Sequence, residues 1–178
     1  MKKVILFIAF LGFNIILLAQ VELKGIKLGS IYPGEIHSYS QGSESIKTTV
    51  GGLKSILYIR LLADNRVYRI MFTPQVDYSL DPDPTLHISI NEVNNLVKGL
   101  DNKYKLEFIK QLENKDNWKF HSGEYEFFDF KDGVKYSIRI INHNIEKAYP
   151  ISFFLTMTNQ RLEKLHDEQK QKKNNSDF

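Results

Sequence analysis

The sequence LKSILYIRLLADNRVYRIMFTP, residues 53–74, has two apolar runs on either side of a short polar segment. Asp64 and Asn65 in that segment tolerate the positive φ angles of the primed turns that connect paired strands. Apolar and more polar residues alternate along both runs, which is typical of strands with one buried face. We therefore predict a central β-hairpin that ends at Pro74, because proline has no N–H group for a strand ladder.

The two faces of this hairpin differ in chemistry. Leu57, Ile59 and Leu61 share a face that is entirely apolar. Arg60 and Arg69 belong to the opposite face, where they alternate with large apolar and aromatic residues. This contrast predicts an antiparallel sheet that is covered on one side and partly exposed to water on the other.

The same periodicities predict the other elements. Further strands are expected at residues 21–29, 46–50, 104–112, 118–121, 124–130, 134–141 and 151–157. One helix is expected after a cap at Ser89 or Asn91, with a stop near Asn102, and a second over residues 160–173 after a cap at Thr158 or Asn159. The sequence therefore predicts an α+β protein in which an antiparallel sheet of six or seven strands is packed by two helices.

The order of strands followed by a helix occurs twice, which indicates a duplicated unit. We expect a single domain over residues 21–172, divided into halves 21–102 and 103–172, and a disordered tail at 173–178. In outline this order is similar to the small sheet-and-helix modules of exported bacterial proteins of the β-lactamase-inhibitor type and the outer-membrane assembly lipoprotein type. That similarity concerns architecture only and implies no functional residues.

The first twenty residues have the layout of a secretory signal peptide. Lys2 and Lys3 precede an apolar run over residues 4–19, which is shorter than the roughly 20 residues that span a membrane. We expect cleavage near Ala19, with a signal peptide at 1–20 and no stable membrane anchor afterwards; an uncleaved anchor is the alternative. The mature protein is then expected in the periplasm or outside the cell.

Composition excludes several classes of protein. The chain has no cysteine, and therefore no disulfide, no thiolate zinc site and no lipid-carrying cysteine after the signal. Without Lys2 and Lys3 the formal charge falls from +3 to +1, because 22 basic residues then face 21 acidic ones. So small a net charge does not predict a nucleic-acid partner.

A weak calcium motif lies before the first predicted helix. Asp81, Asp83 and Glu92 have the spacing of positions 1, 3 and 12 of a calcium-binding loop. Position 6, where the loop needs glycine, is Leu86, and prolines stand at two loop positions. The favoured interpretation is an acidic, proline-stiffened turn that leads into a capped helix, with no metal and no cofactor.

Catalytic patterns are no stronger. The histidines lack the spacing of a metal site, no serine has the glycines of a nucleophile elbow, and no glycine-rich phosphate loop is present. His37 and His121, together with carboxylates, leave open a small hydrolase that acts on a cell-wall or glycan substrate. A carrier of small ligands is a further alternative, since a cavity cannot be inferred from periodicity.

The sequence instead favours a non-enzymatic envelope protein that binds another envelope protein. Aromatic residues are concentrated near the predicted strand 124–130, and adjacent Phe127 and Phe128 must face opposite sides of the sheet. We predict binding through the mixed face of the sheet or through the 30–45 loop. The candidate binding residues are Arg60, Arg69, Trp118, Tyr125, Phe128 and Phe130.

Overall fold

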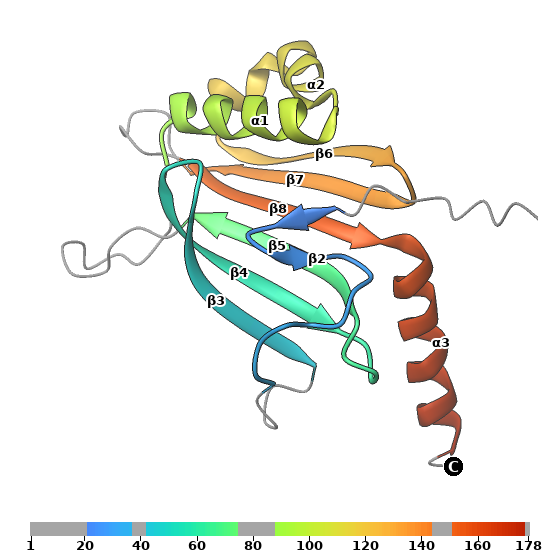
Figure 1. Ribbon diagram of the computed structural model, residues 1–178. Coiled ribbons are helices and arrows are strands. Elements are labelled where there is room, and N and C mark those ends of the chain that lie inside the picture. The colour runs from blue at the N-terminus through green and yellow to red at the C-terminus, as the bar shows by residue number, and fades with distance from the viewer. Residues whose placement is uncertain (1–20, 37–41, 75–87, 144–150, 177–178) are drawn as a thin grey trace, which may run out of the picture.

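The computed structural model describes residues 21–36, 42–74, 88–143 and 151–176 (Figure 1). Six antiparallel strands form one sheet in the order β3-β4-β5-β8-β7-β6. These strands are β3 (Ser43–Val50), β4 (Leu53–Leu61), β5 (Val67–Pro74), β6 (Gly123–Lys131), β7 (Val134–Asn142) and β8 (Ile151–Asn159). The predicted α+β class and the predicted antiparallel sheet are therefore confirmed.

The sheet is built from two meanders of three strands each. β3, β4 and β5 form one half of the sheet, β6, β7 and β8 form the other half, and the last strand of each meander pairs at the centre. The central hairpin is β4–β5, and β5 ends at Pro74 as predicted. The turn residue Asn65 has φ 65°, and in the turn between β6 and β7 both Asp132 and Gly133 have positive φ.

A bulge in the central hairpin changes which side chains of β5 are buried. The register shifts between Arg60 and Leu61, so that Arg60 lies opposite Arg69 whereas Leu61 lies opposite Val67. An extra residue in one strand reverses the alternation on one side of the bulge. Val67 therefore joins the main core, and Tyr68 points to the opposite face, in contrast to the strict alternation expected from the sequence.

One face of the sheet is covered by helices and by a small hairpin. Helix α1 (Ile90–Tyr104), helix α2 (Phe108–Asn114) and the 3₁₀ helix η1 (Asp116–Lys119) contribute side chains to the same core as Leu57 and Ile59. The two-residue strands β1 (Glu22–Leu23) and β2 (Ile26–Lys27) add Leu23 and Ile26 to this core. Figure 1 shows α1 and α2 side by side next to β6, β7 and β8.

The predicted start of α1 is confirmed in detail. Ser89 is the N-cap, and its hydroxyl accepts a hydrogen bond from the backbone N–H of Glu92. The Glu92 carboxylate in turn accepts from the backbone N–H of Ser89 at 2.7 Å, which completes a capping box. The helix continues past the stop expected at Asn102 and ends with Lys105 in the left-handed conformation.

Three segments predicted as single strands have other structures. Residues 21–29 form the β1–β2 hairpin, because Lys24 and Gly25 both have positive φ and reverse the chain. Within 104–112, Tyr104 ends α1, whereas Phe108, Ile109 and Leu112 belong to α2, where Phe108 and Leu112 are four residues apart and share the buried side of the helix. Residues 118–121 fall in and after η1, which buries Trp118 completely.

Helix α3 (Gln160–Ser176) follows β8 directly and extends beyond the sheet (Figure 1). The Asn159 side chain accepts a hydrogen bond from the backbone N–H of Leu162, so Asn159 is the cap, as one of the two predicted alternatives. The helix continues to Ser176, past the boundary at residue 172 expected from the sequence. With α1 and α2 it gives three α-helices in the described residues, where two were predicted.

Candidate functional site

The face of the sheet opposite α1 and α2 keeps most of its side chains in contact with solvent. We call it the open face, and define it by the outward side chains of β3 to β8 that the strand register places on this side. They are Ser43, Ser45, Lys47 and Thr49; Lys54, Ile56, Tyr58 and Arg60; Arg69, Met71 and Thr73; Glu124, Glu126, Phe128 and Phe130; Lys135, Ser137, Arg139 and Ile141; and Ser152, Phe154, Thr156 and Thr158.

The register arranges these side chains in rows that cross the strands. One row contains Arg60, Arg69, Thr158, Lys135 and Phe130 on β4, β5, β8, β7 and β6, respectively. The next row, over the same strands, contains Tyr58, Met71, Thr156, Ser137 and Phe128. A cationic row therefore runs beside an apolar and hydroxyl-bearing row.

Large apolar side chains of the open face are exposed. The exposed fractions are 38% for Tyr58, 40% for Phe128 and 59% for Phe130. Met71 and Phe154, between them in the sheet, are half-buried. Aromatic and thioether groups at this exposure form the kind of surface that loses contact with water when another molecule docks.

The cationic row contains two arginines in direct opposition. Arg60 and Arg69 are partners in the β4–β5 ladder, where opposite side chains start about 5 Å apart and like charges repel. Arg69 donates to the carboxylate of Glu163 on α3, and its guanidinium lies 5.7 Å from the centre of the Tyr68 ring. Arg60 is exposed, and no carboxylate in the described part of the chain forms an ion pair with it.

The other end of that row is also basic. The Lys135 amino group lies 4.5 Å from the centre of the Phe128 ring, which is within the range of a cation–π contact. In contrast, Arg139 is neutralised by Glu124, with 2.6 Å between Nε and Oε1 and a second hydrogen bond of 2.8 Å from Nη2. The hydrogen bond that Arg139 donates to Glu124 raises the pKa of the guanidinium.

Helix α3 forms a boundary at one end of the open face. Leu162 is buried with Leu62 and Tyr68 in a small apolar cluster separate from the main core. The Tyr68 ring stacks on the His166 ring with 4.7 Å between centres, and burial raises the pKa of the Tyr68 hydroxyl. The first turns of α3 therefore lie against β5, directly beside the cationic row.

The six binding residues predicted from the sequence are divided between the two faces. Arg60, Arg69, Phe128 and Phe130 lie together on the open face, in the two adjacent rows. Trp118 is fully buried in the core on the opposite side. Tyr125 is half-buried on that same side, where its hydroxyl donates to the backbone oxygen of His121 at 3.2 Å.

The remaining candidates are only partly within the described residues. Asp81, Asp83 and His37 lie outside them. Glu92 closes the capping box of α1, and His121 is exposed next to η1. The beginning of the 30–45 loop is held against the central hairpin, because Ile31 bridges to Arg66 and Tyr32 donates its backbone N–H to Asn65.

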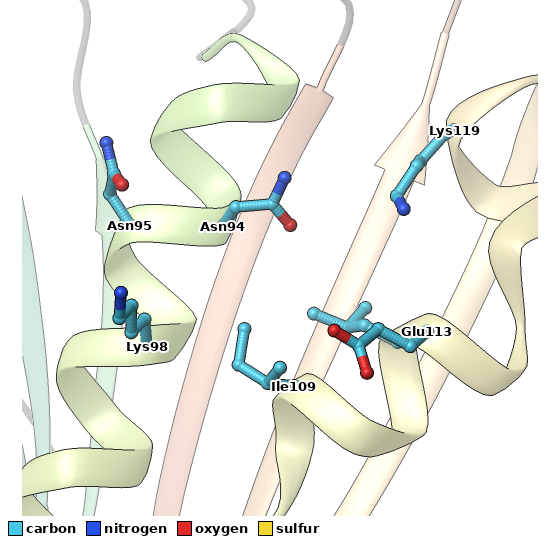
Figure 2. A pocket seen from close by; sticks show the side chains of 7 residues that line it. Asn94, Asn95, Lys98, Ile109, Glu113 and Lys119 are labelled. Carbon is cyan, nitrogen blue, oxygen red and sulfur yellow. The ribbon is translucent and has the colours of Figure 1, made fainter.

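A hollow of about 370 Å³ lies between α1, α2 and η1 (Figure 2). Its lining comprises Asn94, Asn95, Lys98, Ile109, Leu112, Glu113 and Lys119. The lining combines the apolar side chains of Ile109 and Leu112 with amide, basic and acidic side chains, and Leu112 is its only fully buried member. This hollow lies away from the open face, on the helical side of the molecule.

Within 21–36, 42–74, 88–143 and 151–176, no group of three or more His, Asp or Glu side chains is placed to hold a metal ion. Across the same residues, every helix is too short or too polar to cross a membrane.

Sequence reasoning did not identify Tyr58, Met71 and Lys135 as part of the site. The sequence pattern did place each of them on an outward face, because each alternates with core residues along its strand. The rows themselves depend on the strand order, in which β5 pairs with β8 across a long sequence separation. Alternation assigns a residue to a face but does not assign neighbours from other strands.

No protein-family model, no curated protein and no solved structure matches this chain. The function is therefore inferred from the chain's own residues.

Proposed function

We propose that this chain is an exported, non-enzymatic envelope protein that binds another envelope protein through the open face. The observation that carries this proposal is the set of exposed aromatic side chains Tyr58, Phe128 and Phe130 on a sheet face that the three helices leave largely uncovered. Large exposed aromatics on a regular, rigid surface are typical of docking sites, since aromatic anchors contribute much of the binding energy at interfaces.

The export part of this proposal rests on the sequence. Lys2, Lys3 and the apolar run that follows support a signal peptide at 1–20. Intact mass of the protein recovered from the envelope fraction is the measurement, and a mass that begins after residue 19 or 20 is expected. A protein that retains Lys2 and Lys3 and stays with the cytoplasmic fraction would contradict export.

The sheet topology supports a duplicated origin for this surface. Each half contains a meander of three antiparallel strands followed by a helix, and the two meanders meet at the β5–β8 pair. On this proposal, halves 21–102 and 103–172 descend from one unit, and the open face is continuous across both. The pair of Met71 on β5 and Thr156 on β8, where the two halves meet, then lies at the centre of the binding surface.

Site-specific photocrosslinking in the organism of origin tests the binding role. A photoreactive amino acid replaces Tyr58 or Phe130 on the open face, and the matched control replaces Lys98, which is exposed on the helical side. We expect a defined crosslinked adduct from the two open-face positions and none from Lys98. Adducts from Lys98 alone, or hydrolysis of cell-wall glycans by the purified protein that His121→Ala abolishes, would contradict the proposal.

A further inference from the structure

We infer that the partner presents an extended acidic segment that crosses the strands of the open face, with one carboxylate at Arg60 and another at Lys135. This inference rests on the proposed binding function and adds the chemistry of the partner. Three observations support it: the charge of the open face, the spacing between Arg60 and Lys135, and the apolar row beside them.

The charge of the open face is predominantly positive. Its sheet residues include the basic side chains of Lys47, Lys54, Arg60, Arg69, Lys135 and Arg139, against the acidic side chains of Glu124 and Glu126. Glu124 is already engaged by Arg139, and Glu163 of α3 engages Arg69. In the row that Arg60, Arg69 and Lys135 share, Arg60 and Lys135 are therefore the cations that an acidic partner can neutralise.

The position of Arg60 strengthens this assignment. Its charge lies opposite that of Arg69, and Glu163 supplies a single carboxylate for the pair. Repulsion between opposite like charges disfavours this arrangement in the free protein. A carboxylate from a partner placed at Arg60 relieves the repulsion, so the same contact stabilises the complex and removes an unfavourable interaction.

The spacing of the cations sets the geometry of the segment. Arg60 on β4 and Lys135 on β7 occupy one row and are separated by the strands β5 and β8. Three interstrand steps correspond to roughly 14 Å, which an extended chain spans in about four residues. Side chains about four positions apart in an extended segment point to the same side, so two acidic residues at that spacing reach both cations.

The apolar row determines the rest of the recognition. This row lies two residues away from the cationic row along each strand and contains Tyr58, Met71 and Phe128. Apolar side chains of the partner that flank its acidic residues can pack on this row. The inference therefore specifies an acidic segment with aromatic or aliphatic side chains, and excludes a basic or a uniformly polar one.

A random linear peptide library displayed on phage is the probe, selected against the purified full-length mature protein. We expect enriched peptides that combine aromatic or aliphatic residues with two acidic residues about four positions apart. Their affinity is expected to fall about tenfold in Arg60→Glu and in Lys135→Glu, and to decrease as salt is raised. Lys98→Glu on the helical side is the matched control and is expected to bind as the wild type does.

The outcomes separate this inference from the proposed function. Enriched peptides that are neutral or basic, and whose binding is lost in Phe128→Ser, would overturn the acidic partner but support the open face as a binding site. Peptides that bind equally well to Phe128→Ser, Arg60→Glu and the wild type, or the absence of any enriched peptide, would overturn both. Arg60→Gln removes the charge without reversing it, and circular dichroism confirms that each variant is folded.

Discussion

The carboxylate of Asp101 in the last turn of α1 accepts hydrogen bonds from the first backbone N–H groups of α2, at 3.1 Å from Phe108 and 2.7 Å from Ile109. The residue that precedes α2, Glu107, makes no side-chain capping hydrogen bond. Asp101 therefore acts as a cap across the turn between the helices. It holds α2, and with it Phe108 and Leu112, over the core.

Loss of this cap is expected to destabilise the fold. Asp101→Ala leaves two N–H groups at the start of α2 without their acceptor, which costs about 1–2 kcal/mol of unfolding free energy. Asp101→Asn keeps one acceptor oxygen and is expected to lose less. Urea unfolding followed by the fluorescence of Trp118, the single tryptophan, is the measurement. The exposed neighbour Asn102→Ala is the control, and an Asp101→Ala variant as stable as Asn102→Ala would contradict the capping role.

The buried tyrosines predict a loss of stability in alkaline solution. Burial raises the pKa of Tyr104 to about 12 and also raises the pKa of Tyr136, whose ring lies 5.5 Å from that of Tyr104. Because the folded pKa exceeds the unfolded value of 10.0, the folded state holds these protons more tightly. The stability that these protonated hydroxyls give to the folded state is therefore complete below pH 10 and is lost as the pH rises through about 12.

Phenolate absorbance and unfolding free energy measured against pH check this prediction. Tyr104→Phe is expected to flatten the decline in stability between pH 10 and 12, because the ionising hydroxyl is gone. At neutral pH it is expected to cost about 1 kcal/mol, since Tyr104 donates a 2.7 Å hydrogen bond to the backbone oxygen of Glu22. Tyr58→Phe, at an exposed position, is the control, and an equal flattening in that variant would contradict the assignment.

A charge in the apolar face of the central hairpin is expected to unfold the protein. Ile59 is fully buried, and its ladder partners are Ile70 on β5 and the buried Glu44 on β3, so Ile59→Asp places a carboxylate in the core directly opposite another acid. The expected loss exceeds about 4 kcal/mol, which is a large part of the stability of a domain of this size. Thr49→Asp, exposed on β3, is expected to melt cooperatively like the wild type, whereas a soluble and cooperatively melting Ile59→Asp would refute the assigned core face.

The attachment of α3 depends on Tyr68. Tyr68→Ala removes the ring that packs on Leu162 and stacks on His166. The ion pair between Glu163 of α3 and Arg69 of β5 is unaffected by this substitution. We expect a loss of about 2–3 kcal/mol and faster amide exchange over residues 160–173, while β7 and β8 stay protected. Hydrogen exchange with mass spectrometry measures this, with exposed Lys164→Ala as the control. Unchanged protection of α3 in Tyr68→Ala would contradict this anchoring role.

Local patterns in the sequence were sufficient for most of the sheet. Alternation located β4, β5, β6, β7 and β8, and the turn residues Asp64 and Asn65 located the reversal between β4 and β5. Alternation did not predict the correct element where a short segment has too few residues to distinguish the two-residue period of a strand from the 3.6-residue period of a helix. Residues 104–112 fit a strand as well as a helix, and the carboxylate of Asp101, seven and eight residues before Phe108 and Ile109, favours the helix.

The candidate site was predictable only in part. Phe128 and Arg60 were placed on an outward face by their positions in the strands, and the structure puts both on the open face. Trp118 was grouped with them because residues 118–121 were expected to be a strand, yet η1 turns its ring into the core. A bulge likewise moved Val67 into the core, and no local pattern in the sequence marks the position of that bulge.

The sequence by itself determined where most strands of the large sheet and its central turn lie, which side chains of those strands are apolar, and where α1 begins, because these depend on neighbours a few residues away. The tertiary structure decided the rest: the pairing of β5 with β8, the placement of all covering helices but α3 on one face, and the opposition of Arg60 and Arg69. These features arise from contacts between residues distant in the chain, whose energies depend on packing and charge in three dimensions rather than on the order of residues along one strand.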